Sequence, residues 1–177
     1  KPRELVDNLK NTNMLWRLHA QRLLVERNKK DVVPELIRLV NDKSADEIGL
    51  NAAAIHALWT LHGLGELNTD RTPAYAAAVG ALKHPSAAVR KNAIQVLPKT
   101  AKTGNELLSR NMLNDPDELN VLNTLLAFSE VPVSPAIEKA VLERLANAAE
   151  VDDRWLPDAF AVMLNAHDGS LRKKYIA

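Results

Sequence analysis

The stretch of sequence that decides the fold is WRLHAQRLL, residues 16–24, because two further stretches repeat its pattern without gaps. These are LNAAAIHAL, residues 50–58, and VRKNAIQVL, residues 89–97. Each stretch opens with a large apolar residue followed by Arg or Asn, and then carries alanine and leucine at four-residue intervals. The shared positions are Trp16, Arg17, Ala20 and Leu24; Leu50, Ala54 and Leu58; and Val89, Arg90, Ala93 and Leu97.

Weaker copies of the same pattern begin at Leu119 and Trp155, with Asn123 in place of the alanine in one and Pro157 inside the other. Successive copies are therefore 30 to 39 residues apart, which leaves room for two helices in each repeat. A small alanine between bulky residues lets a neighbouring helix approach closely. Because one helical pair cannot bury its own apolar face, the pairs are expected to stack. We predict an all-α superhelix of about five helical pairs, forming a single domain over residues 1–177.

The composition favours the same fold class. The chain has 27 Leu and 25 Ala but only seven aromatic residues, a mixture that suits helices better than strands. The longest uncharged apolar stretch, residues 74–82, is far shorter than the roughly 20 residues of a membrane-spanning helix. The absence of cysteine excludes disulfides, thiolate metal sites and a cysteine nucleophile.

Helix boundaries are predicted from apolar spacing and from capping residues. Three pairs have the spacing of a capping box: Ser44 with Glu47, Thr103 with Glu106, and Asp115 with Glu118. The predicted helices cover residues 3–10, 13–28, 32–42, 46–64, 73–84, 86–100, 104–113, 116–130, 135–149, 153–167 and 169–176. No stretch shows sustained period-two alternation. The first residue is Lys1 and no signal peptide is visible, so we expect the chain to be a segment of a longer protein.

The pattern apolar-Arg-x-x-Ala-x-x-x-Leu resembles the first helix of a HEAT repeat. The resemblance extends over residues 3–170 and is strongest at residues 16–24 and 89–97, whereas the copy at residues 50–58 carries Asn51 in place of arginine. It implies an α-solenoid and says almost nothing about activity, since one fold serves many functions.

A narrower resemblance concerns NMLWRLHAQRLLVER, residues 13–27. This string is similar to the opening of the HEAT region in large exported bacterial proteins of the membrane-bound or glucose/sorbosone dehydrogenase type. In those proteins a β-propeller dehydrogenase domain precedes the helices, and a cytochrome c domain often follows them. The resemblance implies a periplasmic or exported connector between a sugar-oxidising unit and an electron acceptor. The connector itself would hold no cofactor.

Residues that carry chemistry elsewhere have structural interpretations here. The five histidines, His19, His56, His62, His84 and His167, lack the spacing of converging zinc ligands. The acidic groups Asp115, Asp117 and Glu118, and Glu150, Asp152 and Asp153, stand at predicted helix N-termini, where negative charge is favourable. No catalytic triad, phosphate-binding glycine loop or zinc-protease motif is found. We therefore predict no catalytic, metal or cofactor-binding residues.

The predicted partner is protein, and its contact surface is the exposed face of the second helix of each pair. This surface includes Arg38, Lys83, Arg110, Lys139 and Arg144, to which we add Trp59 as a partly exposed aromatic. Trp16 and Trp155 are expected to face the core. Arg17 and Arg90 are expected to pair with carboxylates of adjacent helices, for example Asp42 or Asp115.

An enzymatic alternative is a HEAT-like DNA glycosylase, in which Trp59 or Trp155 would act with Asp152, Asp153 or Asp158. The formal net charge of +1 is small for a protein that must neutralise phosphates. Residues 1–30 nevertheless hold eight Lys/Arg against three Asp/Glu. A tetrapyrrole- or sensor-binding HEAT protein is a third alternative, which no residue selects. We expect a scaffold without nucleic-acid binding.

Overall fold

The computed structural model describes residues 1–147, 153–169 and 172–173, and all regular structure in these residues is helical. The predicted all-α fold class is therefore confirmed. The helices fall into two compact units, residues 1–98 and 99–177. Each unit is described by itself.

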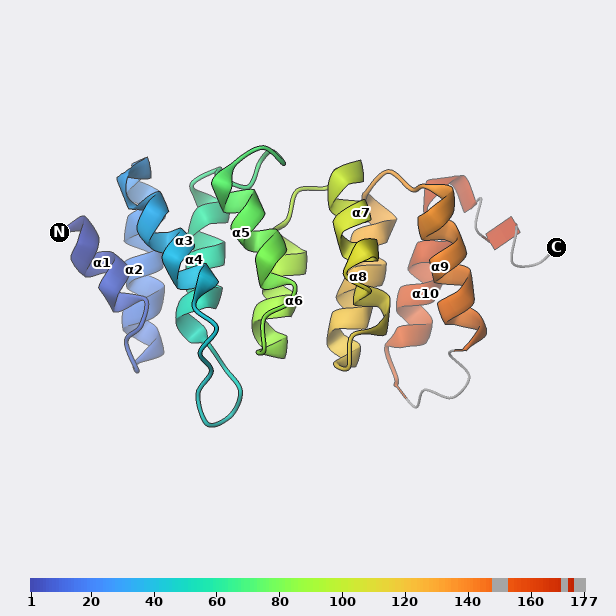
Figure 1. The fold of residues 1–177 in the computed structure, drawn as a ribbon, viewed down its shortest axis with the longest axis horizontal. Coiled ribbons are helices and arrows are strands. Elements are labelled where there is room, and N and C mark those ends of the chain that lie inside the picture. Colours follow the sequence, from blue (N-terminus) through green and yellow to red (C-terminus); the bar gives the residue numbers. More distant parts are fainter. Residues whose placement is uncertain (148–152, 170–171, 174–177) are drawn as a thin grey trace. The chain divides into compact units, whose positions relative to one another are not determined.

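The first unit contains six α-helices that form two layers. They are α1 (Pro2–Asn8), α2 (Met14–Arg27), α3 (Val33–Asn41), α4 (Ala52–Gly63), α5 (Pro73–Ala81) and α6 (Ala87–Val96), with a 3-10 turn, η1 (Lys30–Val32), before α3. Helices α2, α4 and α6 lie side by side and form the first layer, and α3 and α5 lie side by side in the second layer. Helix α1 packs on α2, as α3 packs on α4 and α5 on α6 (Figure 1). We count α1 in the second layer.

The second unit has the same two-layer construction. Its described elements are α7 (Ala101–Ser109), η2 (Met112–Asn114), α8 (Glu118–Glu130), α9 (Pro135–Ala146), α10 (Leu156–Asn165) and η4 (His167–Gly169). Helices α8 and α10 pack side by side as its first layer, and α7 packs against α9 in its second layer.

The three clear sequence copies lie on α2, α4 and α6, which are the three helices of one layer. Their alanines, Ala20, Ala54 and Ala93, are buried, and so are the leucines Leu24, Leu58 and Leu97. Close approach between these helices is visible at Gly63, where an added Cβ would lie 2.6 Å from a methyl carbon of Val25 on α2. The repeated small and large positions are therefore buried in three helices that pack side by side, as the pattern predicts.

The two weaker copies lie on α8 and α10, but their register differs by one residue from the predicted one. On α8 the buried positions are Asn120, Thr124 and Phe128, whereas Leu119 is exposed. On α10 Leu156 and Phe160 are buried, whereas Trp155 is exposed. Thr124, and not Asn123, thus takes the place of the alanine. The predicted starts of these copies, at Leu119 and Trp155, are therefore each one residue too early.

The predicted helix 46–64 is too long, because residues 42–51 form a loop. The carboxylate of Asp46 accepts hydrogen bonds from the backbone N–H groups of Ile48 (3.1 Å) and Leu50 (2.8 Å). Gly49 has a φ of +76°, a left-handed conformation that glycine adopts readily. Asn51 then caps α4 by accepting a hydrogen bond from the N–H of Ala54. Ser44 is not a helix cap.

Two further predicted caps are shifted. Helix α7 begins after Thr100, whose hydroxyl accepts a hydrogen bond from the N–H of Thr103. Thr103 therefore lies inside this helix and is not its cap. Helix α8 is capped by Asp117, and the side chain of Asp115 accepts a hydrogen bond from the N–H of Asp117. The predicted helix 169–176 lies largely outside the described residues.

Candidate functional site

The position that follows the first apolar residue of each clear copy has the same role in all three. Arg17 Nη1 donates to the carbonyls of Asn11 (2.7 Å) and Thr12 (2.9 Å). Arg90 Nη1 donates to the carbonyls of His84 (2.8 Å) and Pro85 (3.0 Å). Asn51 Nδ2 donates to the carbonyls of Asp42 (3.1 Å) and Ser44 (2.9 Å). We call this position the turn clamp, because each side chain holds the turn that leads into its own helix.

The turn clamp corrects the prediction for Arg17. Among the described residues, this guanidinium binds backbone carbonyls and a histidine and forms no ion pair with Asp42. The carboxylate of Asp42 instead accepts a hydrogen bond from the N–H of Ser44 (2.9 Å). Hydrogen bonds to Ser44 lower the pKa of Asp42.

A polar bridge connects α2 to α4 beside the first turn clamp. Arg17 Nε donates to His56 Nε2 (3.3 Å), and His56 Nδ1 lies 2.6 Å from the amide oxygen of Gln21. These contacts fit a neutral imidazole that carries its proton on Nδ1. Burial, together with the positive charge of Arg17, lowers the pKa of His56.

His84 forms a second bridge, between the end of α3 and the turn before α6. Its Nδ1 accepts a hydrogen bond from the N–H of Ser86 (3.0 Å), so Nε2 carries the proton and donates to the carbonyl of Asp42 (2.8 Å). Burial lowers the pKa of this imidazole. Both histidines thus act as neutral structural links, which accounts for them without a metal.

A hollow of about 670 Å³ lies in the first unit beside the first two turn clamps. It is lined by Lys10, Asn11, Thr12, Arg17, Asp42, Ser44, Ala45, Asp46, Leu50, Asn51, Ala52 and Ala53. The carboxylates of Asp42 and Asp46 both accept backbone N–H groups of the 42–51 loop. The hollow is therefore the polar junction of two turns.

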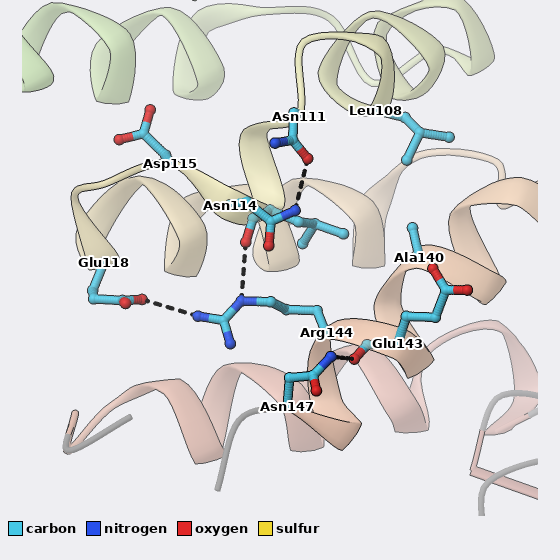
Figure 2. A pocket seen from close by; sticks show the side chains of 10 residues that line it. Leu108, Asn111, Asn114, Asp115, Glu118, Ala140, Glu143, Arg144 and Asn147 are labelled. Atoms are coloured by element: carbon cyan, nitrogen blue, oxygen red, sulfur yellow. Dashed lines mark hydrogen bonds and ion pairs between the residues drawn. The ribbon is translucent and has the colours of Figure 1, made fainter. Parts of the chain in front are cut away.

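A hollow of about 520 Å³ lies within the second unit, between the turn before α8 and helix α9. Its lining consists of Leu108, Asn111, Leu113, Asn114, Asp115, Glu118, Ala140, Glu143, Arg144 and Asn147. Figure 2 shows the guanidinium of Arg144 pointing toward Glu118, with 3.5 Å between Nη2 and a carboxylate oxygen. Arg144 Nε donates to the carbonyl of Leu113 (3.1 Å).

The chemistry of this second hollow is hydrogen bonding. Its lining supplies amides, carboxylates and one guanidinium, and contains no hydroxyl, thiol or imidazole that would serve as a nucleophile. Asn114 Nδ2 donates to Asn111 Oδ1 (2.7 Å), and Asn147 Nδ2 donates to the carbonyl of Glu143 (2.9 Å). Such groups can donate and accept hydrogen bonds with a polar ligand.

The predicted contact residues lie on or next to second-layer helices, but they differ in exposure. Arg38 on α3, Lys83 after α5 and Lys139 on α9 are exposed. Arg110 follows α7 and pairs with Glu106 at 3.0 Å. Arg144 on α9 is largely buried, because it bridges to Glu118 and the carbonyl of Leu113. The sequence pattern does not predict the hollow of the second unit, because the residues that line it come from segments far apart in the sequence.

The three tryptophans are not equivalent. Trp59 is half-buried, and its Nε1 donates to Asn92 Oδ1 on α6 (2.6 Å). Trp155 is exposed beneath the Arg154 guanidinium, which lies 4.8 Å from the ring centroid. Trp16 is 56% exposed. The prediction that Trp16 and Trp155 face the core is therefore wrong.

Among the described residues, those named for the glycosylase alternative do not come together as a catalytic group. The side chain of Asp153 accepts the N–H groups of Trp155 (2.8 Å) and Leu156 (2.9 Å) at the start of α10. Asp158 lies in the first turn of α10. Glu150 and Asp152 lie outside the described residues. Within the described part of the chain, no three histidine or carboxylate side chains converge as metal ligands.

Comparison with known proteins gives no further assignment. No protein-family model, curated protein or solved structure matches the chain. Among the described residues, no helix is long and apolar enough to cross a membrane.

Proposed function

We propose that this chain is a non-catalytic, HEAT-like scaffold that binds protein partners. The observation that carries the proposal is the turn clamp, which has the same role at Arg17, Asn51 and Arg90 in three successive helices of one layer. A side chain that fixes the entry to each stacked helix serves the geometry of a repeat array. In such arrays, the contacts between repeats provide stability and the outer surfaces are left for binding.

The two hollows support the same function. The carboxylates of Asp42 and Asp46 in the hollow of the first unit accept hydrogen bonds from loop amides, and Glu118 in the hollow of the second unit pairs with Arg144. In both hollows these carboxylates are therefore engaged in contacts within the protein, as expected of structural residues.

The proposed contact surface is the second layer of each unit. Its exposed cations include Arg38, Lys83 and Lys139, so a partner with carboxylates on its own surface is favoured. We propose that the partner is a domain of an exported sugar dehydrogenase, which is supported by the resemblance of residues 13–27 to the HEAT regions of such proteins.

A photo-crosslinking experiment tests this proposal. A benzophenone amino acid is placed at Lys83, at Lys139 or, as a control, at Leu119, which is exposed on a first-layer helix. In the cells that produce the protein, the two second-layer positions should give adducts with the same protein, identified by mass spectrometry, and Leu119 should not. Charge reversal by Arg38→Glu, in the same unit as Lys83, should lower the yield at Lys83. Adducts with nucleic acid, or equal adducts at all three positions, would refute the proposal.

A further inference from the structure

The connection between α3 and α4 is longer than the fold requires. In the first unit, five residues connect α1 to α2 (9–13) and five connect α5 to α6 (82–86), whereas ten connect α3 to α4 (42–51). All three connections lead into a first-layer helix and are held by a turn clamp. Five residues are therefore enough for this connection. In repeat proteins, insertions of this kind lie in loops on one face, which is often the binding face.

The longer loop places an isoleucine in solvent. Ile48 is 84% exposed, whereas the other nine exposed large apolar side chains of the described residues are 37–60% exposed. Figure 1 shows the loop extending beyond the ends of α3 and α4. Helices α2, α5 and α6 pack against the sides of this pair. A helical pair that preceded α1 would stack on α1 and α2 in the same way, so an extension of the array in that direction would not cover Ile48.

The tip of the loop is held in place by its own hydrogen bonds. The carboxylate of Asp46 accepts the N–H groups of Ile48 (3.1 Å) and Leu50 (2.8 Å), and the N–H of Asp46 donates to the carbonyl of Leu50 (2.8 Å). The N–H of Gly49 donates to the carbonyl of Asp46 (2.9 Å), which closes a turn around Ile48. A side chain that an ordered loop presents loses less conformational freedom on binding than one on a flexible segment.

The base of the loop is attached to neighbouring segments of the first unit. The carbonyl of Asp42 accepts a hydrogen bond from His84 Nε2 (2.8 Å). Lys43 Nζ donates to the carbonyl of Gly80 on α5 (3.4 Å). Since Gly80 precedes Lys83 by three residues, the loop lies beside the second-layer surface of this unit.

The charge of the loop indicates what kind of surface it contacts. Residues 42–51 hold three carboxylates and one lysine. One of these carboxylates belongs to Glu47, which is exposed and directly precedes Ile48. An acidic loop complements a basic protein surface and is repelled by anionic lipid. A pocket with apolar walls and lysine or arginine at its rim would suit both side chains.

From these observations we infer that Ile48 is the anchor of an interaction site on the loop 42–51, and that it inserts into an apolar pocket with a basic rim on a partner protein. Burial of one isoleucine side chain is enough for a gain in affinity of roughly ten- to a hundredfold. Glu47 pairs with the rim, while the second-layer cations contact carboxylates elsewhere on the partner. This inference rests on the proposed scaffold function and adds the residue that anchors it.

A photo-crosslinker in the loop tests the inference in the whole chain. A benzophenone amino acid replaces Ala45, which is exposed in the same loop, in the cells that produce the protein. It should form an adduct with a separate polypeptide. Mass spectrometry should place the adduct on a peptide of that partner that carries apolar residues and a lysine or arginine. The adduct supports the inference only if its yield depends on Ile48.

Substitutions made together with the benzophenone at position 45 measure this dependence. Ile48→Asp should lower the adduct yield at least about tenfold, since it places a charge in an apolar pocket, whereas Ile48→Val should keep most of the yield. Glu47→Lys should lower it about threefold by repulsion from the basic rim. Leu119→Asp is the matched control, because Leu119 is an exposed apolar residue on α8, and it should leave the yield unchanged. Circular dichroism confirms that all variants fold.

Several results would overturn the inference. They are no adduct at position 45, an adduct whose yield Ile48→Asp leaves unchanged, and an adduct with the same polypeptide, with a second copy of the chain or with lipid. The two proposals fail separately. Adducts at Lys83 and Lys139 without an Ile48-dependent adduct at position 45 would overturn this inference and leave the scaffold function intact. The reverse result would refute the second-layer surface and leave the Ile48 anchor in place.

Discussion

Replacing Arg17 with methionine removes the first turn clamp while keeping most of the apolar stem. The guanidinium loses hydrogen bonds of 2.7 and 2.9 Å to two carbonyls and a longer one of 3.3 Å to His56. A hydrogen bond from a charged group contributes about 1.5–3 kcal/mol when buried. Because Arg17 is half-buried, we expect a loss of about 2–3 kcal/mol for the three bonds together.

The matched control is Arg22→Met on the same helix. Arg22 is exposed and forms one ion pair, with Glu26, so its replacement should cost less than about 0.5 kcal/mol. Urea unfolding followed by circular dichroism measures both changes. The Arg17→Met variant should also raise the pKa of His56, since the Arg17 charge contributes to lowering it; NMR titration of the imidazole measures this shift. Equal stability losses in the two variants would refute the turn clamp.

Two further predictions concern packing and pH. Gly63→Ala should destabilise the chain by about 1–2 kcal/mol, because the new methyl would lie 2.6 Å from Val25; Gly80→Ala, with nothing within 4 Å, should stabilise it by about 0.5–1 kcal/mol. Thermal unfolding should therefore show a lower melting temperature for Gly63→Ala and a higher one for Gly80→Ala than for the unchanged chain. Because burial lowers the pKa values of His56 and His84, the unfolded chain binds more protons in acid. The two histidines should stabilise the fold fully above about pH 6.5, and this stabilisation should be lost as the pH falls through their folded-state pKa values. A urea midpoint that stays constant when the pH is lowered from 7.5 to 5 would contradict the prediction.

The sequence predicts much of this fold because its apolar period is strong where helices stack. Ala20, Ala54 and Ala93 locate the first layer, since a small residue at that position matters only if another helix approaches. The sequence does not predict the loop 42–51, because Ser44 and Glu47 have the spacing of a capping box. In the structure Asp46 instead accepts hydrogen bonds from backbone N–H groups of this loop. Such local side-chain bonds compete with a helix and leave no periodic signal.

The site is less predictable for a different reason. Whether Trp16 is buried depends on a neighbour beside α2, not on its own helix, so the repeat pattern alone predicts burial and the structure shows exposure. The sequence around Arg144 is typical of an exposed cation. Its side chain is nevertheless largely buried, because it donates a hydrogen bond to the carbonyl of Leu113 in a turn that is distant in the sequence.

Cysteine accessibility tests the stacking register most directly, because the chain contains no cysteine of its own. Single cysteines are introduced as Leu23→Cys and Val96→Cys, and their reaction with a maleimide is timed in the native protein. We predict that the thiol at position 23 reacts as an exposed thiol does, and that the thiol at position 96 reacts at least about a hundredfold more slowly, since it is reached only through local opening. Equal rates at the two positions would contradict the account.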